Sequence, residues 1–261
     1  MVDRPSHRPV DFHLVVPCYT ESLRLPPFLD DLLSALGGER YRGHILIVDD
    51  GSSGSDRQQL AALVSSRANR DNPTLSVMHL DRNRGKGYAV REGWRAGAVA
   101  RWLAFADADG ATPAYEIARV FNKAYHDSDP LRCYLGSRVR MLGRTVERDW
   151  TRHLLGRAYA YLVGTLIEGA VYDSQCGFKL VSQEAFAAIG DLLREDRFAF
   201  DAELIAALAD AGYRLEEVAV DWRDVPGSKV SLMKDSTRMV LSLIAIHRRR
   251  RRGGYRREDS P

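Results

Sequence analysis

The chain has 261 residues, of which 45% are hydrophobic and 28% charged, a composition that suits one large globular domain and excludes a wholly disordered protein. Its formal charge is +3, but residues 247–261 contribute +5 and leave −2 for the rest. A mildly acidic body without a recognition motif argues against a nucleic-acid partner. The three cysteines form no CxxC motif, which excludes a disulfide framework or zinc site and fits a reducing compartment. No apolar stretch reaches about 18 residues, so no membrane-spanning helix is predicted.

Apolar runs and amphipathic stretches alternate over the first half of the chain. The apolar runs predict short buried strands at 12–17, 44–49, 75–80, 102–106 and 133–136. The stretches between them predict helices at 26–36, 56–67, 85–100 and 113–126. Strands separated by helices of this length predict an α/β fold with a Rossmann-like, mostly parallel sheet and flanking helices.

The pattern changes after Arg138. Strands are predicted at 177–181 and 215–220, and helices at 147–168, 201–211 and 234–246. The first and last of these helices are amphipathic, so C-terminal amphipathic helices complete the predicted architecture. We divide the chain into an N-terminal extension at 1–10, a single domain at 11–246 and a basic, disordered tail at 247–261.

Acidic residues follow three of the predicted strands. Glu21 comes shortly after the first strand, Asp49 and Asp50 end the second, and Asp107 and Asp109 follow the fourth. Because the carboxyl ends of parallel strands meet at one edge of a sheet, these carboxylates crowd together there. Such crowding is unfavourable unless a cation or hydrogen-bond donors occupy the edge, and Mg²⁺ or Mn²⁺ with phosphate and water as further ligands fits it. For Asp50 taken alone, capping of a helix is the simpler explanation.

A glycine-rich turn with basic residues follows the third strand. Gly85 and Gly87 let the backbone approach a ligand closely, and the helix that follows offers its N-terminal amides to an anion. Arg84 and Lys86 add positive charge. Next to the acidic strand ends, this turn predicts a site for a cation and a diphosphate.

These segments together resemble the inverting family 2 glycosyltransferases of GT-A fold. The matching blocks keep that family's order and cover most of residues 11–230: VVPCYTE, IVDDGSSGSD, NRGKGYAVREG, FADADGAT, GSR, DSQCGFKL and FAFDAEL. DADGAT, QCGFKL and the GSK block at 227–229 are similar to the branch of β-glucosyltransferases that act on dolichyl or other polyprenyl phosphates. Thr20 departs from the PxYNE block of the family, which has Asn there. The resemblance makes 11–138 the nucleotide-sugar half and 139–246 the acceptor half.

The resemblance implies a metal-dependent hexosyltransferase with a UDP-sugar donor, glucose being the expected sugar, and a polyprenyl phosphate acceptor. Asp107 and Asp109 would bind Mg²⁺ or Mn²⁺, which stabilises charge on the departing UDP. The acceptor phosphate would bind Arg138, Arg152 and Lys229. The residues that match the donor site are Pro17, Tyr19, Glu21, Asp49, Asp50, Lys86 and Asp107.

The acceptor decides whether the reaction needs a general base. A sugar hydroxyl has a high pKa and needs one, whereas a polyprenyl phosphate is already an anion. By resemblance, Asp109, Asp173 and Asp201 are the candidate catalytic carboxylates. Asp173 and Asp201 would either act as a base or orient the arginines, and capping of the helix that begins near Asp201 is an equal alternative for that residue.

A lipid acceptor requires a surface that faces a membrane. The segments 147–168 and 231–252 have the composition of interfacial helices, and Arg248–Arg252 would meet anionic headgroups. In the alternative interpretation both helices pack on the sheet and the tail is solvated. The expected location is cytoplasmic, peripheral at the cytoplasmic face of the membrane.

Three other functions compete with this interpretation. The first is a soluble family 2 enzyme with a sugar or small-molecule hydroxyl as acceptor. The second is a haloacid-dehalogenase-type phosphatase with Asp107 as nucleophile and Asp109 as acid, although that motif normally follows the first strand and here follows the fourth. The third is an inactive relative that binds nucleotide, which the intact DAD sequence disfavours.

Overall fold

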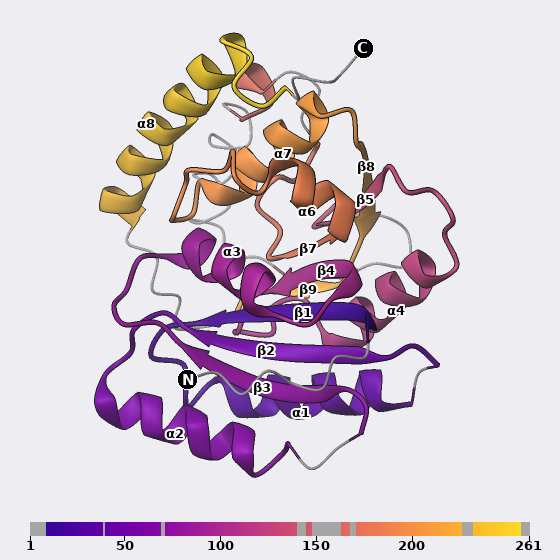
Figure 1. Cartoon of the computed structure of the whole chain (residues 1–261). Coiled ribbons are helices and arrows are strands. Elements are labelled where there is room, and N and C mark those ends of the chain that lie inside the picture. Colours follow the sequence, from indigo (N-terminus) through magenta and orange to yellow (C-terminus); the bar gives the residue numbers. More distant parts are fainter. Residues whose placement is uncertain are drawn as a thin grey trace.

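The computed structural model describes residues 9–38, 40–68, 71–139, 145–147, 163–167, 171–225 and 232–256. Its centre is a seven-stranded sheet with the order β3-β2-β1-β4-β7-β5-β8 (Figure 1). The strands are β1 (Val10–Cys18), β2 (Gly43–Asp49), β3 (Thr74–His79), β4 (Ala100–Ala106), β5 (Arg132–Ser137), β7 (Phe178–Ser182) and β8 (Arg214–Ala219). Two short strands, β6 (Val146–Glu147) and β9 (Trp222–Arg223), form a separate pair.

The first four strands run parallel, as the sequence predicts. β1 pairs in parallel with both β2 and β4, and β2 pairs in parallel with β3. β7 is antiparallel to its neighbours β4 and β5, a reversal that the sequence pattern does not reveal. The carboxyl ends of β1–β4 therefore meet at one edge of the sheet, the left-hand edge in Figure 1.

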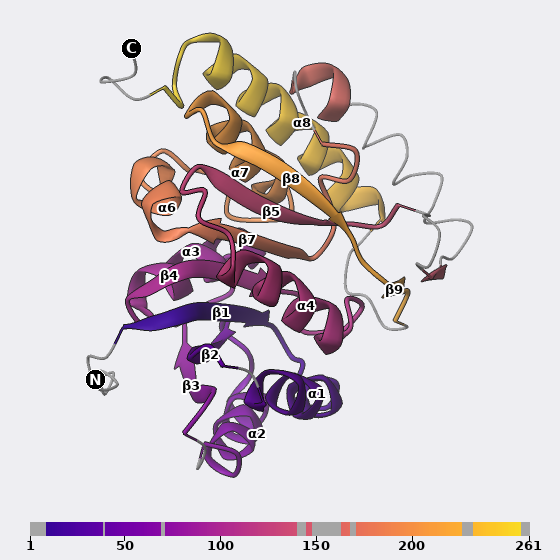
Figure 2. The same ribbon diagram turned by 90° about the vertical axis from the view of Figure 1, so that its right-hand side faces the viewer.

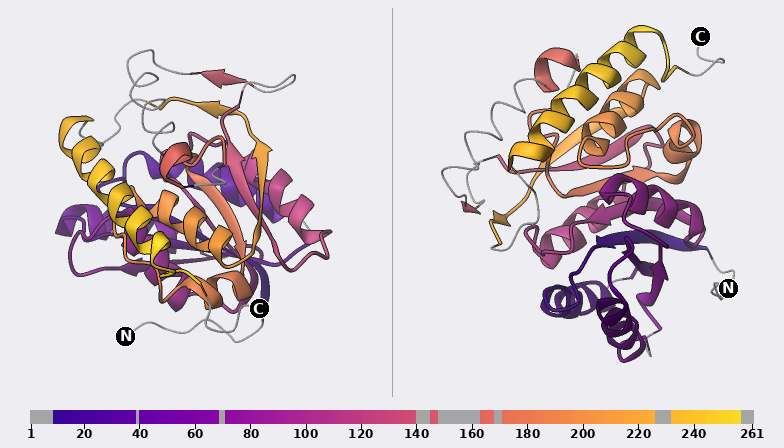
Figure 3. Two further views of the ribbon diagram at one scale, coloured as in Figure 1. Left: turned by 90° about the horizontal axis from the view of Figure 1, so that it is seen from above. Right: turned by 90° about the vertical axis from the view of Figure 1, so that its left-hand side faces the viewer.

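Helices cover both faces of the sheet (Figure 2). One face packs against α1 (Leu25–Gly37), α2 (Gly54–Ser65) and α4 (Ala114–Tyr125). The other face packs against α3 (Lys86–Ala96), α6 (Gln183–Ile189), α7 (Phe200–Asp210) and α8 (Leu232–Arg251). The architecture is the predicted α/β one with a C-terminal helix on the outside (Figure 3).

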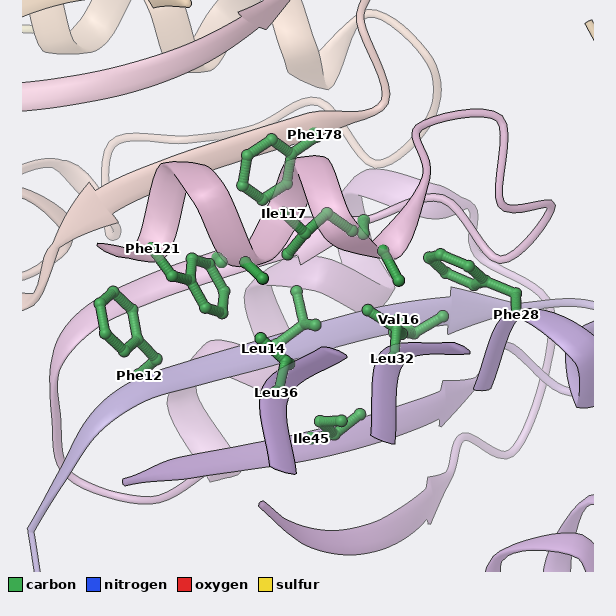
Figure 4. Close-up of a cluster of buried hydrophobic side chains, with 14 of the residues drawn as sticks. Phe12, Leu14, Val16, Phe28, Leu32, Leu36, Ile45, Ile117, Phe121 and Phe178 are labelled. Atoms are coloured by element: carbon green, nitrogen blue, oxygen red, sulfur yellow. The ribbon is translucent and has the colours of Figure 1, made fainter. Parts of the chain in front are cut away.

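The alternation of side chains along β1 divides the apolar core into two clusters. Leu14 and Val16 point to the face covered by α1 and α4, whereas Val15 packs on the α3 side. Figure 4 shows the first cluster, in which Phe12 of β1 stacks on Phe121 of α4 with ring centroids 4.3 Å apart. Because β1 is buried on both faces, its backbone is a fixed base for the loop that follows it.

Two predictions for the second half of the chain need correction. The helix predicted at 147–168 does not begin at 147, because Val146 and Glu147 form β6, in which Glu147 pairs with Arg223 of β9. Residues 163–166 are helical, and the rest of that segment lies outside the described residues. Helix α6 was not predicted; its N-cap is Ser182, whose side chain accepts a hydrogen bond from the Ala185 amide.

The tail predicted to be disordered from residue 247 is ordered to residue 256. Helix α8 continues through Arg251, and Arg249 forms an ion pair with Glu203 of α7. Tyr255 is fully buried and donates a hydrogen bond of 2.8 Å from its hydroxyl to Glu203. The buried carboxylate of Glu203 needs donors, and the C-terminal segment supplies them. Within the described parts of the chain, no helix has the length and apolar character of a membrane span.

Replacement of Tyr255 by alanine tests whether this segment contributes to the fold. We expect Tyr255→Ala to lower the free energy of unfolding by about 3 kcal/mol, because it leaves a cavity and removes a donor from a buried carboxylate. Urea denaturation measures the change. Arg256→Ala, at an exposed position one residue later, is the control and should have little effect. Equal stability of the two variants would contradict the ordered C-terminal segment.

Candidate active site

The predicted acidic residues do gather at the carboxyl edge of the sheet, but they have different partners. Asp49 is fully buried, accepts a hydrogen bond of 3.0 Å from the Ser52 amide, and lies 2.9 Å from the Nδ1 atom of His79. Asp50 accepts hydrogen bonds from the amides of Arg84 (2.9 Å) and Gly85 (2.7 Å). Asp50 therefore holds the turn that leads into α3 rather than capping the helix after its own strand. Burial is the main cause that raises the pKa of its carboxyl.

The loop after β1 approaches the same edge from the side. Pro17 lies within β1, and Tyr19 at the start of the loop has 44% of its surface exposed. Thr20 has a φ of 51° and donates its amide to the Ser52 hydroxyl at 2.8 Å. Glu21 forms an ion pair of 3.4 Å with Arg24, which is also one of the charges that favour ionised Asp109. This turn therefore places an exposed tyrosine at the carboxyl edge of the sheet.

Asp107 and Asp109 form the acidic centre of the site. Asp109 accepts a hydrogen bond of 3.0 Å from the Ala111 amide, and the Asp107 amide donates to the Gly177 carbonyl at 2.9 Å. Burial, followed by repulsion from Asp107, raises the pKa of Asp109. No group of three or more His, Cys, Asp or Glu side chains suited to a metal exists among the described residues. Carboxylate oxygens are ligands that Mg²⁺ and Mn²⁺ bind, together with water and phosphate oxygens.

Gly177 is required because the Asp107 carboxylate lies directly against it. A Cβ atom at this position would lie 2.1 Å from Oδ2 of Asp107. The glycine belongs to the loop before β7, so the antiparallel strand beside β4 shapes the acidic centre. This contact explains the glycine of the DSQCGFKL block in physical terms.

A buried lysine bridges Asp107 to Asp201 of α7. The Nζ atom of Lys86 lies 2.9 Å from Oδ1 of Asp107 and 3.1 Å from Oδ2 of Asp201, and 4.7 Å from the ring centre of Phe105. Burial alone would lower the pKa of Lys86, but the two carboxylates outweigh it and raise that pKa. Lys86 therefore carries a permanent positive charge at the acidic centre.

Lys179, which sequence reasoning missed, completes the row of charges. Its fully buried Nζ atom lies 2.6 Å from Oδ1 of Asp201 and donates to the Cys176 carbonyl at 2.9 Å. Burial opposes ionisation of Asp201, yet Lys179 and then Lys86 lower its pKa. Asp201 therefore binds two lysines and does not orient the arginines of the predicted acceptor site. It also does not cap α7, whose N-cap is Ala199. A lysine within the predicted buried strand of the GFKL sequence was the signal that could have indicated a buried ion pair here.

Asp173 holds Arg138 in a fixed orientation. Its carboxylate accepts hydrogen bonds of 2.7 Å from Nε and Nη2 of Arg138 and of 2.8 Å from the Arg138 amide. Burial opposes ionisation of Asp173, but Arg138 lowers its pKa below the usual value. Glu217, also missed from the sequence, accepts from the Asp173 amide at 2.9 Å and fixes that loop. The other two predicted acceptor-phosphate residues, Arg152 and Lys229, lie outside the described residues.

The mostly parallel sheet with helices on both faces is the GT-A type of glycosyltransferase fold. The model of the glycosyl transferase family 2 matches residues 13–190, and the chain belongs to this family.

Relatives and solved structures agree with this assignment. Dolichyl-phosphate beta-glucosyltransferase of Homo sapiens is 32% identical over 257 residues, which cover 95% of this chain and 78% of the human protein. The enzyme of the same name from Dictyostelium discoideum is 29% identical, over 92% and 76% of the two chains. Glucosyl-3-phosphoglycerate synthase from Mycobacterium tuberculosis in complex with Mn²⁺, UDP and phosphoglyceric acid has the same fold, with a TM-score of 0.65, 13% identity and coverage of 92% and 78%.

Gly177→Ala tests the packing at the acidic centre. We expect the new methyl group to displace the Asp107 carboxylate and to lower the affinity for Mn²⁺ with UDP at least about tenfold, since one ligand is moved. Titration calorimetry measures this affinity. Gly54→Ala is the matched control, because a Cβ there meets nothing within 4 Å. Equal affinities of the two variants would contradict the contact.

Thr20→Asn tests the cost of the left-handed turn. A β-branched residue is strained at a φ of 51°, whereas asparagine adopts this conformation readily. We expect the substitution to raise the free energy of unfolding by about 0.5–1 kcal/mol. The same change at Thr74, which lies in a strand, should bring no gain. A loss of stability at Thr20 would contradict the argument from backbone strain.

Proposed function

We propose that this chain transfers glucose from UDP-glucose to a polyprenyl phosphate of the dolichyl type, with inversion at the sugar. The observation that carries the proposal is the state of the two candidate bases. Asp173 is saturated by Arg138, Asp201 is held between Lys86 and Lys179, and the pKa of each is lowered. Carboxylates occupied in this way are poor proton acceptors, which suits an acceptor that is already ionised.

The donor is assigned to the edge where β1, β2 and β4 end. Tyr19 and Asp49 would bind the uridine, with Pro17, Glu21 and Asp50 shaping the loops around it. The charges of Asp107 and Asp109 outnumber the single charge of Lys86, which fits a divalent cation there. Mg²⁺ or Mn²⁺ at these carboxylates would stabilise negative charge on the departing UDP. The Mn²⁺ and UDP in the complex of similar fold support this assignment.

The acceptor phosphate is assigned to the side of Arg138. Asp173 positions the guanidinium of Arg138, and the Cζ atom of Arg138 lies over the ring of Trp222, 5.2 Å from the ring centre. We propose that Arg152 and Lys229 add to this cationic site. A phosphate oxygen of the lipid attacks the anomeric carbon, the bond from that carbon to the UDP oxygen breaks, and no proton has to be removed. The positive charge of Lys86 would stabilise the negative charge that develops on the leaving diphosphate.

Two further observations bear on location and on the alternatives. The three cysteines are buried and free, which supports a reducing compartment such as the cytoplasm. A soluble acceptor with a hydroxyl group would need a base, and neither Asp173 nor Asp201 is placed to act as one. Membership of the glycosyltransferase family leaves no support for the phosphatase hypothesis.

Release of UDP by the purified protein tests the proposal. We expect release from UDP-glucose to require both a divalent cation and a short-chain polyprenyl phosphate in detergent. Asp109→Asn should slow turnover about 100-fold or more, since it removes charge that binds the cation. Asp191→Asn, at a side chain that is 99% exposed, is the control. Metal-dependent release that the lipid does not change would refute the lipid acceptor, and full activity of Asp109→Asn would refute the site.

A further inference from the structure

The arginines of helix α8 divide into two sets. Arg249 is paired with Glu203, and Arg250 with Asp210 at 2.8 Å, so both hold the helix to α7. Arg238, Arg248 and the last arginines of the run lie on the exposed side and form no ion pair with a described residue. The consecutive arginines are therefore not one cationic tail, because part of their charge is used inside the fold.

The exposed side of α8 forms a continuous stripe with helical spacing. Its exposed positions recur every three or four residues, which places them on one face of the helix. Leu241 is 62% exposed and Ile244 is 36% exposed, so two large apolar side chains lie between the arginines. From residue 237 onward, where the side chains of α8 are described, the stripe contains no carboxylate. Its members are Thr237, Arg238, Leu241, Ile244, Ala245, Arg248, Arg251 and Arg252.

A groove beside the first half of α8 extends the cationic surface. It has a volume of about 670 Å³ and lies between α8, the turn before α3 and the loop before α7. Arg82 and Arg197 line it opposite Arg238, and they too form no ion pair with a described residue. Two carboxylates, Glu195 and Asp196, also line the groove, and Asp196 is paired with Arg84 and Arg91.

We propose that the stripe of α8 and this groove are the surface with which the chain docks on an anionic phospholipid bilayer. Arginines and exposed apolar side chains on one helix face are the combination that binds such a surface, the arginines meeting headgroups and the apolar groups entering the acyl boundary. A nucleic acid or an acidic protein would account for the arginines but gives no reason for exposed Leu241 and Ile244.

Docking through the stripe of α8 would bring the membrane close to the carboxyl edge of the sheet, where the proposed active site lies. The groove brings residues 238–242 of α8 to the turn between β3 and α3, and this turn lies at the edge where β1–β4 end. The groove residues Arg84 and Arg197 stand in the chain shortly before Lys86 and Asp201. A lipid phosphate in the bound bilayer would thus be presented next to the site. This biological role rests on the proposed function, whereas the docking itself does not.

Flotation with lipid vesicles tests the surface. We expect the full chain to float with vesicles of phosphatidylcholine and phosphatidylglycerol, to float less with phosphatidylcholine alone, and to dissociate as salt is raised. The variant Arg238→Glu/Arg248→Glu should bind the anionic vesicles at least about tenfold more weakly. The matched control is Arg40→Glu/Arg42→Glu, with the same change of charge at exposed positions beside the opposite end of β2. Equal losses in the two variants, or equal binding of both kinds of vesicle, would overturn the proposal.

The apolar contribution and the catalytic function are tested separately. Leu241→Ser/Ile244→Ser should weaken binding to anionic vesicles at every salt concentration; unchanged binding would refute insertion of these side chains. Both stripe variants should keep turnover with a short-chain polyprenyl phosphate in detergent, where no bilayer is present. Vesicle binding without sugar transfer to any lipid phosphate would refute the proposed function and leave docking intact. Sugar transfer to a lipid phosphate without vesicle binding would refute docking and leave the proposed function intact.

Discussion

The pairing of the buried Lys86 ammonium group with Asp107 and Asp201 is the interaction on which the acidic centre depends. A buried charge is tolerated only when it is paired, and removal of one partner typically costs about 3–5 kcal/mol. Here the pairing continues through Asp201 to Lys179, so the row of charges joins β4, α3, α7 and β7. These elements come from both halves of the chain. The row therefore fixes the first half of the chain against the second at the acidic centre.

The same pairing constrains the chemistry. In an inverting transfer to a hydroxyl, one carboxylate must be free to take a proton as the new bond forms. Asp201 and Asp173 instead have their lone pairs occupied by cationic donors, and both belong to the framework that orients lysine or arginine. The site thus has stronger means of holding anions than of removing protons. Two anions, a diphosphate that leaves and a phosphate that attacks, are the substrates that such a site suits.

Local patterns in the sequence were enough to predict the parallel strands and the acidic edge, because strand ends and alternating apolar residues are written within short segments. They were not enough for interactions between distant segments. Lys86 and Asp201 are 115 residues apart, and nothing near either residue indicates the other. The arginine run was wrongly predicted to be disordered for the same reason, since Glu203 and Asp210, its partners, lie 46 and 40 residues away. The reversal of β7 also depends on pairing that only the folded chain shows.

Helix α8 combines these consequences in one element. Its inner side is fixed to α7 through Glu203, only two residues from Asp201. Its outer side carries exposed apolar side chains and arginines that form no ion pair with a described residue. A helix attached in this way has one orientation relative to the row of charges. Contact of the outer side with a flat surface would therefore also set the orientation of the acidic centre relative to that surface, without any movement inside the domain. Attachment by a disordered tail would bring the protein to the same surface but would leave that orientation free.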